Sequence, residues 1–196
     1  MARQRLTLLA RKMRMLIHQL RRLIQRLGMM IIKLKVNLCE QTLSVYDEAN
    51  CIKQYRVSTA KNGAGECFGS YQTPRGRHVI RAKIGAAAPV NTVFVARRPT
   101  GERYAPALRQ AFPDRDWILT RILWLSGLER GKNRLGTVDT MRRYVYIHGT
   151  PDEVAMGVPG SKGCIRMRND ELIELFDLVK VGTKIEITEN GESFSG

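Results

Sequence analysis

Apolar and polar residues alternate along most of the chain from residue 31 onward, in short runs separated by turn-forming residues. The first run, 31–38, places Ile32, Leu34 and Val36 on alternate positions. A period of two is typical of a strand with one buried face. Similar runs occupy 42–46, 52–58, 79–84, 92–96, 118–125, 144–147 and 184–188. The pattern predicts a mostly β domain, with a hairpin between the first two runs.

One segment of this region has helical spacing. Residues 170–179 place apolar side chains on one face: Leu172, Leu175, Phe176 and Val179. We expect this face to pack on the sheet, with Asn169 as the N-cap and Gly182 ending the segment. The fold class predicted here is therefore mostly β with one packed helix.

The first thirty residues have a different pattern. Their apolar residues follow spacings of three and four: Leu6, Leu9, Met13, Leu16, Leu20, Leu23, Leu27 and Met30. This heptad-like stripe predicts a basic amphipathic helix. We expect a helical extension over 1–30 and a single domain over 31–196. The extension can lie on an anionic membrane surface, pair with another helix, or be an upstream addition outside the native protein.

Charge separates these two parts further. The whole chain carries a net charge of +15, and residues 1–30 contain eight Arg or Lys and no acid, which leaves +7 for the rest. Such a field attracts anionic partners. An anionic membrane surface is the expected partner of 1–30, and nucleic acid is the weaker candidate. Arginines interrupt the apolar residues throughout, so no secretory signal is visible, and the run 27–32 is too short to span a bilayer.

The chain has four cysteines, Cys39, Cys51, Cys67 and Cys164, without a C-x-x-C pair. We expect no zinc or redox motif and no metal. The first three lie in or beside apolar runs, so we expect them to be small buried residues. Unpaired thiols fit a reducing compartment better than an oxidising one.

Cys164 stands apart because of its neighbours. His148 closes the apolar run 144–147, and a Gly- and Pro-rich loop leads from it to Cys164. A loop that returns to its starting strand can place a thiol beside an imidazole, which takes up the thiol proton. Gly163 lets the main chain approach a substrate, so the amides of Gly163 and Cys164 are candidates for an oxyanion hole.

The motifs around this pair resemble the L,D-transpeptidase (YkuD) catalytic domain. His148-Gly149 is followed by the run from Ser161 to Met167, S-K-G-C-I-R-M, and upstream the run 73–76, T-P-R-G, looks like the family's T-P-x-G step. The resemblance covers about 31–188. It implies a β-sandwich-like fold, a cysteine nucleophile at Cys164 and a general base at His148. No metal or organic cofactor is implied.

The chain departs from the family pattern at one position. Lys162 stands where the family has a second histidine, which leaves the dyad intact but changes a residue that shapes the site. A cation there can favour the thiolate. Arg166 follows the nucleophile by two residues and can either hold a substrate carboxylate or brace the loop. Ser161 and Gly149 are expected to support the geometry, and a backbone carbonyl just after His148 is expected to orient its ring.

The resemblance implies acyl transfer on peptidoglycan peptide stems through a thioester on Cys164. Two alternatives stay open. Water can replace the acceptor amine, which makes an L,D-carboxypeptidase, or the domain can be a degenerate wall-binding module with a basic membrane anchor. The resemblance places the protein in the cell envelope, whereas the missing signal peptide and the spare thiols leave the cytoplasm open.

Three further segments carry weaker signals. The turn 73–76 is expected to be mainly structural. Residues 97–117 are rich in Arg, Pro and Asp and predict an insertion or a lid over the site. Residues 129–143 predict a loop whose arginines lie on the solvated surface.

Overall fold

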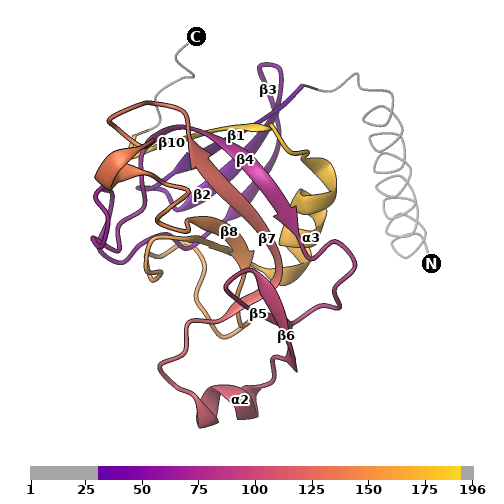
Figure 1. The fold of residues 1–196 in the computed structure, drawn as a ribbon. Helices are drawn as coiled ribbons and strands as arrows, with labels where there is room; N and C mark the ends of the chain where they lie inside the picture. Colours follow the sequence, from indigo (N-terminus) through magenta and orange to yellow (C-terminus); the bar gives the residue numbers. More distant parts are fainter. Residues whose placement is uncertain (1–30, 191–196) are drawn as a thin grey trace, which may run out of the picture. The chain divides into compact units, whose positions relative to one another are not determined.

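The computed structural model describes residues 31–190, which form one strongly curved sheet with a helix packed on it (Figure 1). The strands are β1 Ile32–Asn37, β2 Thr42–Asp47, β3 Asn50–Arg56, β4 Gly76–Ile84, β5 Thr92–Val95, β6 Arg98–Arg103, β7 Ile118–Gly127, β8 Tyr146–Gly149, β9 Ile165–Met167 and β10 Lys184–Thr188. The helices are α2 Pro106–Ala111, the 3-10 turn η1 Gly136–Val138 and α3 Asn169–Leu178. The predicted mostly β fold is confirmed.

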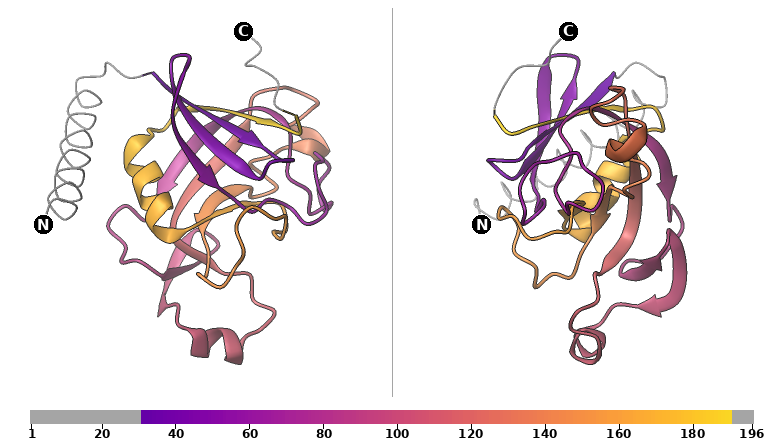
Figure 2. Two further views of the ribbon diagram at one scale, coloured as in Figure 1. Left: turned by 180° about the vertical axis from the view of Figure 1, so that it is seen from behind. Right: turned by 60° about the vertical axis from the view of Figure 1, so that its left-hand side comes forward.

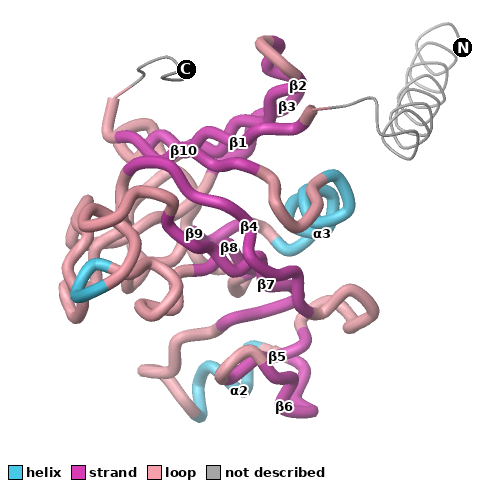
Figure 3. The backbone as a smooth tube through the Cα atoms, turned by 45° about the horizontal axis from the view of Figure 1, so that its top comes forward, coloured by secondary structure: helices cyan, strands magenta, loops and turns pink. Residues whose placement is uncertain are grey.

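The strand order is β3-β2-β1-β10-β4-β7-β5-β6, and β8 and β9 branch from β7. Most neighbours are antiparallel, whereas β1 pairs with β10, and β8 with β9, in parallel. The sheet bends so that β1, β2 and β3 lie across from β7, with α3 between these two layers (Figure 2). The β5–β6 hairpin and α2 extend from the end of β7 (Figure 3).

A single large core joins the two layers. Leu34 and Val36 of β1 have no exposed surface, as their alternation predicts. They belong to one cluster with Leu123 of β7, Ile147 of β8 and Leu172 of α3. Burial of each such side chain contributes about 1.5–3 kcal/mol to stability. Strands β8 and β9 are anchored in this core through Ile147 and Ile165, and the candidate site lies on their other face.

The structure corrects the predicted cap of the packed helix. Helix α3 begins at Asn169, and Arg168 is the N-cap without a side-chain hydrogen bond. The Asn169 side chain instead faces the sheet, where it accepts a hydrogen bond from Thr120 Oγ1 at 2.6 Å. The segment 97–117, predicted as an insertion or lid, contains β6 and the short helix α2, which buries none of its residues. Only α3 is a packed helix among the described residues.

The prediction that three cysteines are buried is wrong. Cys39, Cys51 and Cys67 are exposed, and Cys164 is partly buried. Cys39 lies in the turn between β1 and β2, and Cys51 lies on β3, the edge strand of the sheet. Cys39 follows the run 31–38 and Cys51 precedes the run 52–58, so both lie where the chain turns to the surface.

Some predictions fall outside the described residues. The helix and the membrane contact predicted for 1–30 both lie there. Within residues 31–190, no helix has the length and apolar character needed to cross a membrane. The same residues contain no cluster of three or more His, Cys, Asp or Glu able to hold a metal ion.

Candidate active site

The parallel pair β8–β9 positions both residues of the predicted dyad, because His148 lies on β8 and Cys164 directly precedes β9. His148 pairs with Arg166, and the backbone N–H of Tyr146 donates to Cys164 Sγ at 3.4 Å. Because successive residues of a strand point to opposite faces, Cys164, Arg166 and His148 share one face, while Ile165 points into the core. Parallel pairing thus places Cys164 and His148, sixteen positions apart in the sequence, on one face of neighbouring chain segments.

His148 is fully buried, and its ring orientation is fixed by the backbone. Nδ1 lies 2.8 Å from the carbonyl oxygen of Gly149. A carbonyl can only accept, so we assign the proton to Nδ1 and a lone pair to Nε2. Burial lowers the pKa of His148, which keeps the ring neutral at pH 7. Nε2 is buried without a hydrogen-bond partner, so the basic nitrogen is unengaged.

Cys164 is partly buried at the wall of a pocket. Besides the N–H of Tyr146, its Sγ contacts the carbonyl oxygen of Tyr144, to which it donates at 3.6 Å. Burial raises the pKa of Cys164 to about 12, against the opposing effect of the Tyr146 N–H. The resting dyad is therefore a neutral thiol and a neutral imidazole, and no hydrogen bond joins them in this structure.

The loop before Cys164 is held from within. Ser161 Oγ donates to the carbonyl of Cys164 at 2.6 Å and accepts from the N–H of Gly163 at 3.2 Å. Thr73 Oγ1 donates to the carbonyl of Gly163 at 3.1 Å. Gly163 has a φ of +119°, which side chains rarely permit. The Gly163 N–H, predicted to bind an oxyanion, is thus engaged inside the loop at rest.

The contacts of Arg166 favour the second of its two predicted roles, bracing of the loop. Its Nη2 lies 2.6 Å from Asp116 Oδ1, and its Nη1 donates to the carbonyl of Gly160 at 3.0 Å. The ion pair ties β9 to the segment before β7. Arg166 therefore braces the site, and its charge is already balanced by Asp116.

A pocket of about 590 Å³ opens beside Cys164. Aromatic and cationic side chains line it, among them Tyr71, Arg97, Tyr144 and Lys162. Lys162 is exposed and lines the pocket, and its influence on the thiol stays a prediction. Cys164 therefore borders an open pocket and not the closed core.

Gly149 is fixed by close packing beneath the dyad. A Cβ there would lie 2.2 Å from Asn169 Oδ1 and 2.8 Å from the carbonyl oxygen of Leu119. Asn169 Nδ2 also donates to the carbonyl of Thr150 at 2.9 Å. Any side chain at 149 would displace β8 from β7 and from the start of α3, and so move His148.

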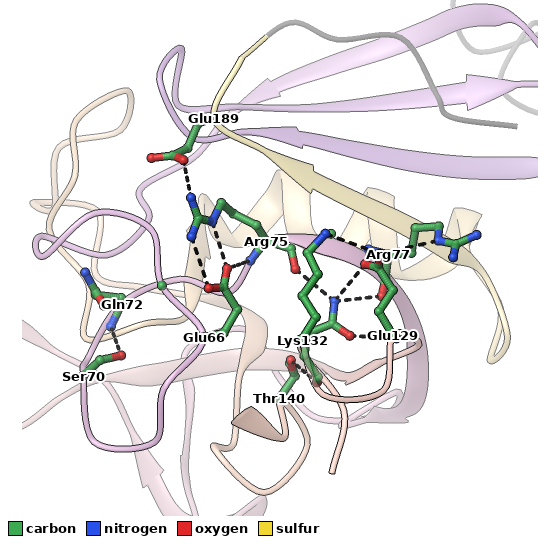
Figure 4. Close-up of polar contacts among 12 residues, drawn as sticks. Glu66, Ser70, Gln72, Arg75, Arg77, Glu129, Lys132, Thr140 and Glu189 are labelled. Atoms are coloured by element: carbon green, nitrogen blue, oxygen red, sulfur yellow. Dashed lines mark hydrogen bonds and ion pairs between the residues drawn. The ribbon is translucent and has the colours of Figure 1, made fainter. Parts of the chain in front are cut away.

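The turn 73–76 is held by ion pairs, in line with its predicted structural role. Arg75 pairs with Glu66 at 2.8 Å and with Glu189 at 2.6 Å (Figure 4). Gly76 has a φ of +92°, and a Cβ there would lie 2.1 Å from Glu129 Oε2. Glu129 accepts the N–H of Arg77 at 2.7 Å (Figure 4). The network fixes the turn whose Thr73 contacts the loop before Cys164.

Arg143 was expected on the solvated surface, and this is wrong. It is partly buried and donates to the carbonyls of Gly65 and Glu66 at 3.0 and 2.9 Å, and to Ser70 Oγ at 3.3 Å. Its donors hold the loop 65–70 against the pocket. The guanidinium supplies hydrogen-bond donors to the carbonyl oxygens of Gly65 and Glu66, which explains why it is not fully solvated.

Sequence reasoning missed three other parts of the site. Asp116 lies in an irregular segment with no periodic signal. The N–H of Tyr146 and the carbonyl of Tyr144 act through the backbone, which no motif marks. A parallel register between the two motif strands would have indicated Tyr146, because it lies two residues before His148.

A model of the L,D-transpeptidase catalytic domain family matches residues 32–187. A Bacillus licheniformis sequence that carries the name L,D-transpeptidase YkuD is 26% identical over 156 residues, covering 80% of this chain and 65% of the relative. A Bacillus subtilis sequence that carries the name L,D-transpeptidase YqjB is 50% identical over 52 residues, covering 26% of this chain and 30% of the relative. The chain thus spans less than two thirds of the length of both relatives.

Solved structures show the same fold. Bd1075 of Bdellovibrio bacteriovorus superposes with a TM-score of 0.51 at 17% identity, covering 82% of this chain and 48% of the other. The L,D-transpeptidase LdtMt1 in complex with imipenem gives 0.50 at 19% identity, covering 81% and 59%. These likenesses concern the fold, and the family model covers most of the chain. The chain belongs to the L,D-transpeptidase catalytic domain family.

Proposed function

We propose that this domain transfers acyl groups between peptidoglycan peptide stems, with Cys164 as nucleophile and His148 as general base. One observation carries the proposal: a pocket-lining thiol shares a strand-pair face with a buried imidazole whose Nε2 has no hydrogen-bond partner. The His148 ring is already in the tautomer that accepts a proton at Nε2, because Gly149 holds Nδ1. Family membership supports the substrate class.

The first half-reaction begins when the thiol rotates from the carbonyl of Tyr144 toward His148 Nε2. As the sulfur bonds to the carbonyl carbon of the stem, its proton passes to Nε2. The C–N bond to the terminal D-alanine then breaks, and Nε2 returns the proton to the leaving amine. The stem is left as a thioester on Cys164.

Backbone amides carry the charge that develops on the carbonyl oxygen. The N–H of Cys164 is the first donor. The N–H of Gly163 is the second, once it exchanges Ser161 Oγ for the oxyanion. Arg166 and Asp116 keep the loop in place during this exchange through their ion pair.

In the second half-reaction, an amine of another stem attacks the thioester carbon and displaces the sulfur. His148 takes the amine proton and passes it to the departing Cys164 thiolate, so a new amide forms and the free thiol is restored. Water as the acceptor would release a tripeptide instead. Envelope localisation follows from this substrate and stays part of the proposal.

The test is acylation by a carbapenem, followed by intact-mass measurement. A relative of this fold has been solved with imipenem, which supports the choice of probe. We expect one adduct on the wild type and none on Cys164→Ala. The matched control is Cys67→Ala, which removes an exposed thiol near the pocket and should keep the adduct.

An unmodified wild type, or an adduct that persists on Cys164→Ala, would refute the proposal. Turnover of a tetrapeptide stem then separates the two acceptors. A cross-linked product identifies the transpeptidase, and a tripeptide alone identifies the carboxypeptidase. Neither product, together with binding to isolated wall polymer, identifies the degenerate module.

A further inference from the structure

The wall of the pocket beside Cys164 is built from residues in an uncommon backbone conformation. Four non-glycine residues that line it have positive φ: Tyr71 at 57°, Ala96 at 46°, Arg97 at 67° and Tyr144 at 57°. L-residues with side chains rarely adopt this conformation. Such residues gather where function requires a side chain in one fixed place.

Arg97 is held by three aromatic side chains, those of Trp124, Tyr144 and Tyr146. With Ala96 it forms the tight turn between β5 and β6, and both residues have the positive φ that this hairpin turn needs. Its guanidinium carbon lies 4.6 Å from the Trp124 ring centroid and 4.9 Å from that of Tyr144. Its Nη1 donates to the Tyr146 hydroxyl at 3.0 Å. Two aromatic rings and one hydrogen bond thus fix the head group.

Two other charged side chains of the pocket wall, Asp116 and Arg143, already have partners of their own. Asp116, the carboxylate of the pocket wall, pairs with Arg166. Arg143, another cation of the wall, donates to backbone carbonyls. Within residues 31–190, Arg97 makes no ion pair with a carboxylate. A positive charge therefore faces the pocket uncompensated.

A guanidinium has five N–H donors in a planar fork that matches a carboxylate. Arg97 uses one of them on the Tyr146 hydroxyl. Tyr146 also supplies the N–H that contacts Cys164 Sγ, so the fork lies within the immediate surroundings of the nucleophile. A carboxylate offers this fork two charged acceptor oxygens, whereas a carboxamide offers one neutral acceptor oxygen and an N–H₂ group that cannot accept.

We propose that Arg97 binds a free carboxylate of the peptide stem and makes the domain selective for carboxylate-bearing over amidated stems. This inference rests on the proposed acyl transfer. A purely structural Arg97 would act differently. It would support Tyr146 and thereby Cys164, and its loss would slow every substrate by the same factor. The ratio between two substrates separates the two roles.

The experiment compares tetrapeptide stems in which one free carboxylate at a time is replaced by its carboxamide. The release of D-alanine gives kcat/KM for wild type, Arg97→Gln, Arg97→Lys and Arg98→Gln. Arg98→Gln is the matched control, because it removes the same charge from the next residue, which is exposed and does not line the pocket. Thermal unfolding of each variant reports its folding.

We expect the wild type to prefer the carboxylate at one position by about tenfold or more, the effect of a charged hydrogen-bonded pair. Arg97→Gln should abolish this preference, Arg97→Lys should keep part of it, and Arg98→Gln should keep all of it. Equal turnover of acid and amide by the wild type overturns the inference and leaves the proposed function standing, as does an unchanged preference in Arg97→Gln. A wild type that neither turns over stems nor forms a carbapenem adduct overturns both.

Discussion

The molecule contains two fully buried histidines on neighbouring parts of its sheet, and they differ in one respect. Both ring nitrogens of His78 have partners, the carbonyl of Gly76 at 2.9 Å and Thr140 Oγ1 at 3.0 Å. His148 has a partner at Nδ1 alone. A buried polar nitrogen without a partner is costly, so folds rarely keep one without a use. Burial is common to both, and the unsatisfied nitrogen is what distinguishes the candidate base.

The same substitution at both histidines tests this comparison most strongly. His148→Gln should slow carbapenem acylation by about a hundredfold to ten-thousandfold, the contribution of a general base. His78→Gln should leave the acylation rate per folded molecule unchanged, because its ring has no route to the pocket. Time courses of adduct formation by intact mass give both rates, and the folded fraction is read from circular dichroism. Equal losses in the two variants would contradict the distinction.

Lowering the pH should reduce the free energy of unfolding through His78. Burial lowers the pKa of His78 from 6.5 to about 4. The unfolded chain therefore takes up this proton first as the pH falls, and the stability that neutral His78 contributes is complete above about pH 6.5 and lost toward about pH 4. The full loss amounts to about 3 kcal/mol.

Urea unfolding at pH 7 and at pH 4.5 measures this loss in wild type and in His78→Gln. The variant should lose less stability between the two pH values, because only the wild type carries the buried imidazole at position 78. Titrating carboxylates affect both proteins equally and cancel in the difference. Parallel losses would mean that the imidazole of His78 is not kept neutral by the fold.

The smallest effect is expected from placing an imidazole at position 162 of the pocket wall. Lys162→His restores the family residue at an exposed position of the pocket wall, and we expect the acylation rate to change by less than about fivefold, since exposed charges contribute little in water. Lys162→Gln controls for the loss of charge. A large rise specific to histidine would show that the dyad alone is insufficient and would favour a degenerate domain.

The positions of most strands could be predicted from the alternation of apolar and polar residues. Alternation marked β1 because Leu34 and Val36 face one core, and the apolar run ending at His148 located β8 to within two residues. The relation of Cys164 to His148 needed the family resemblance, because periodicity does not specify parallel pairing. Once that register is known, Arg166 falls on the same face without further information.

The rest depended on tertiary contacts that leave no local signal. Asn169 has the propensity of a helix cap, yet its amide is used between Thr120 and Thr150, beneath Gly149. Asp116 lies in a segment without a period, and only the fold places it against Arg166. Local propensity yields to such contacts where several elements meet at one point.

The parallel pairing of β8 and β9, and not the loop that connects them, sets the spacing of Cys164 and His148. Cys164 and His148 are spaced by the backbone hydrogen bonds of this strand pair. The chain between them runs out to the surface and back, with residues 152–156 mostly at the surface. Insertions or exchanges in that excursion leave the spacing intact. A randomised library confined to 152–156 is thus a direct starting point for evolving altered properties without rebuilding the reactive pair.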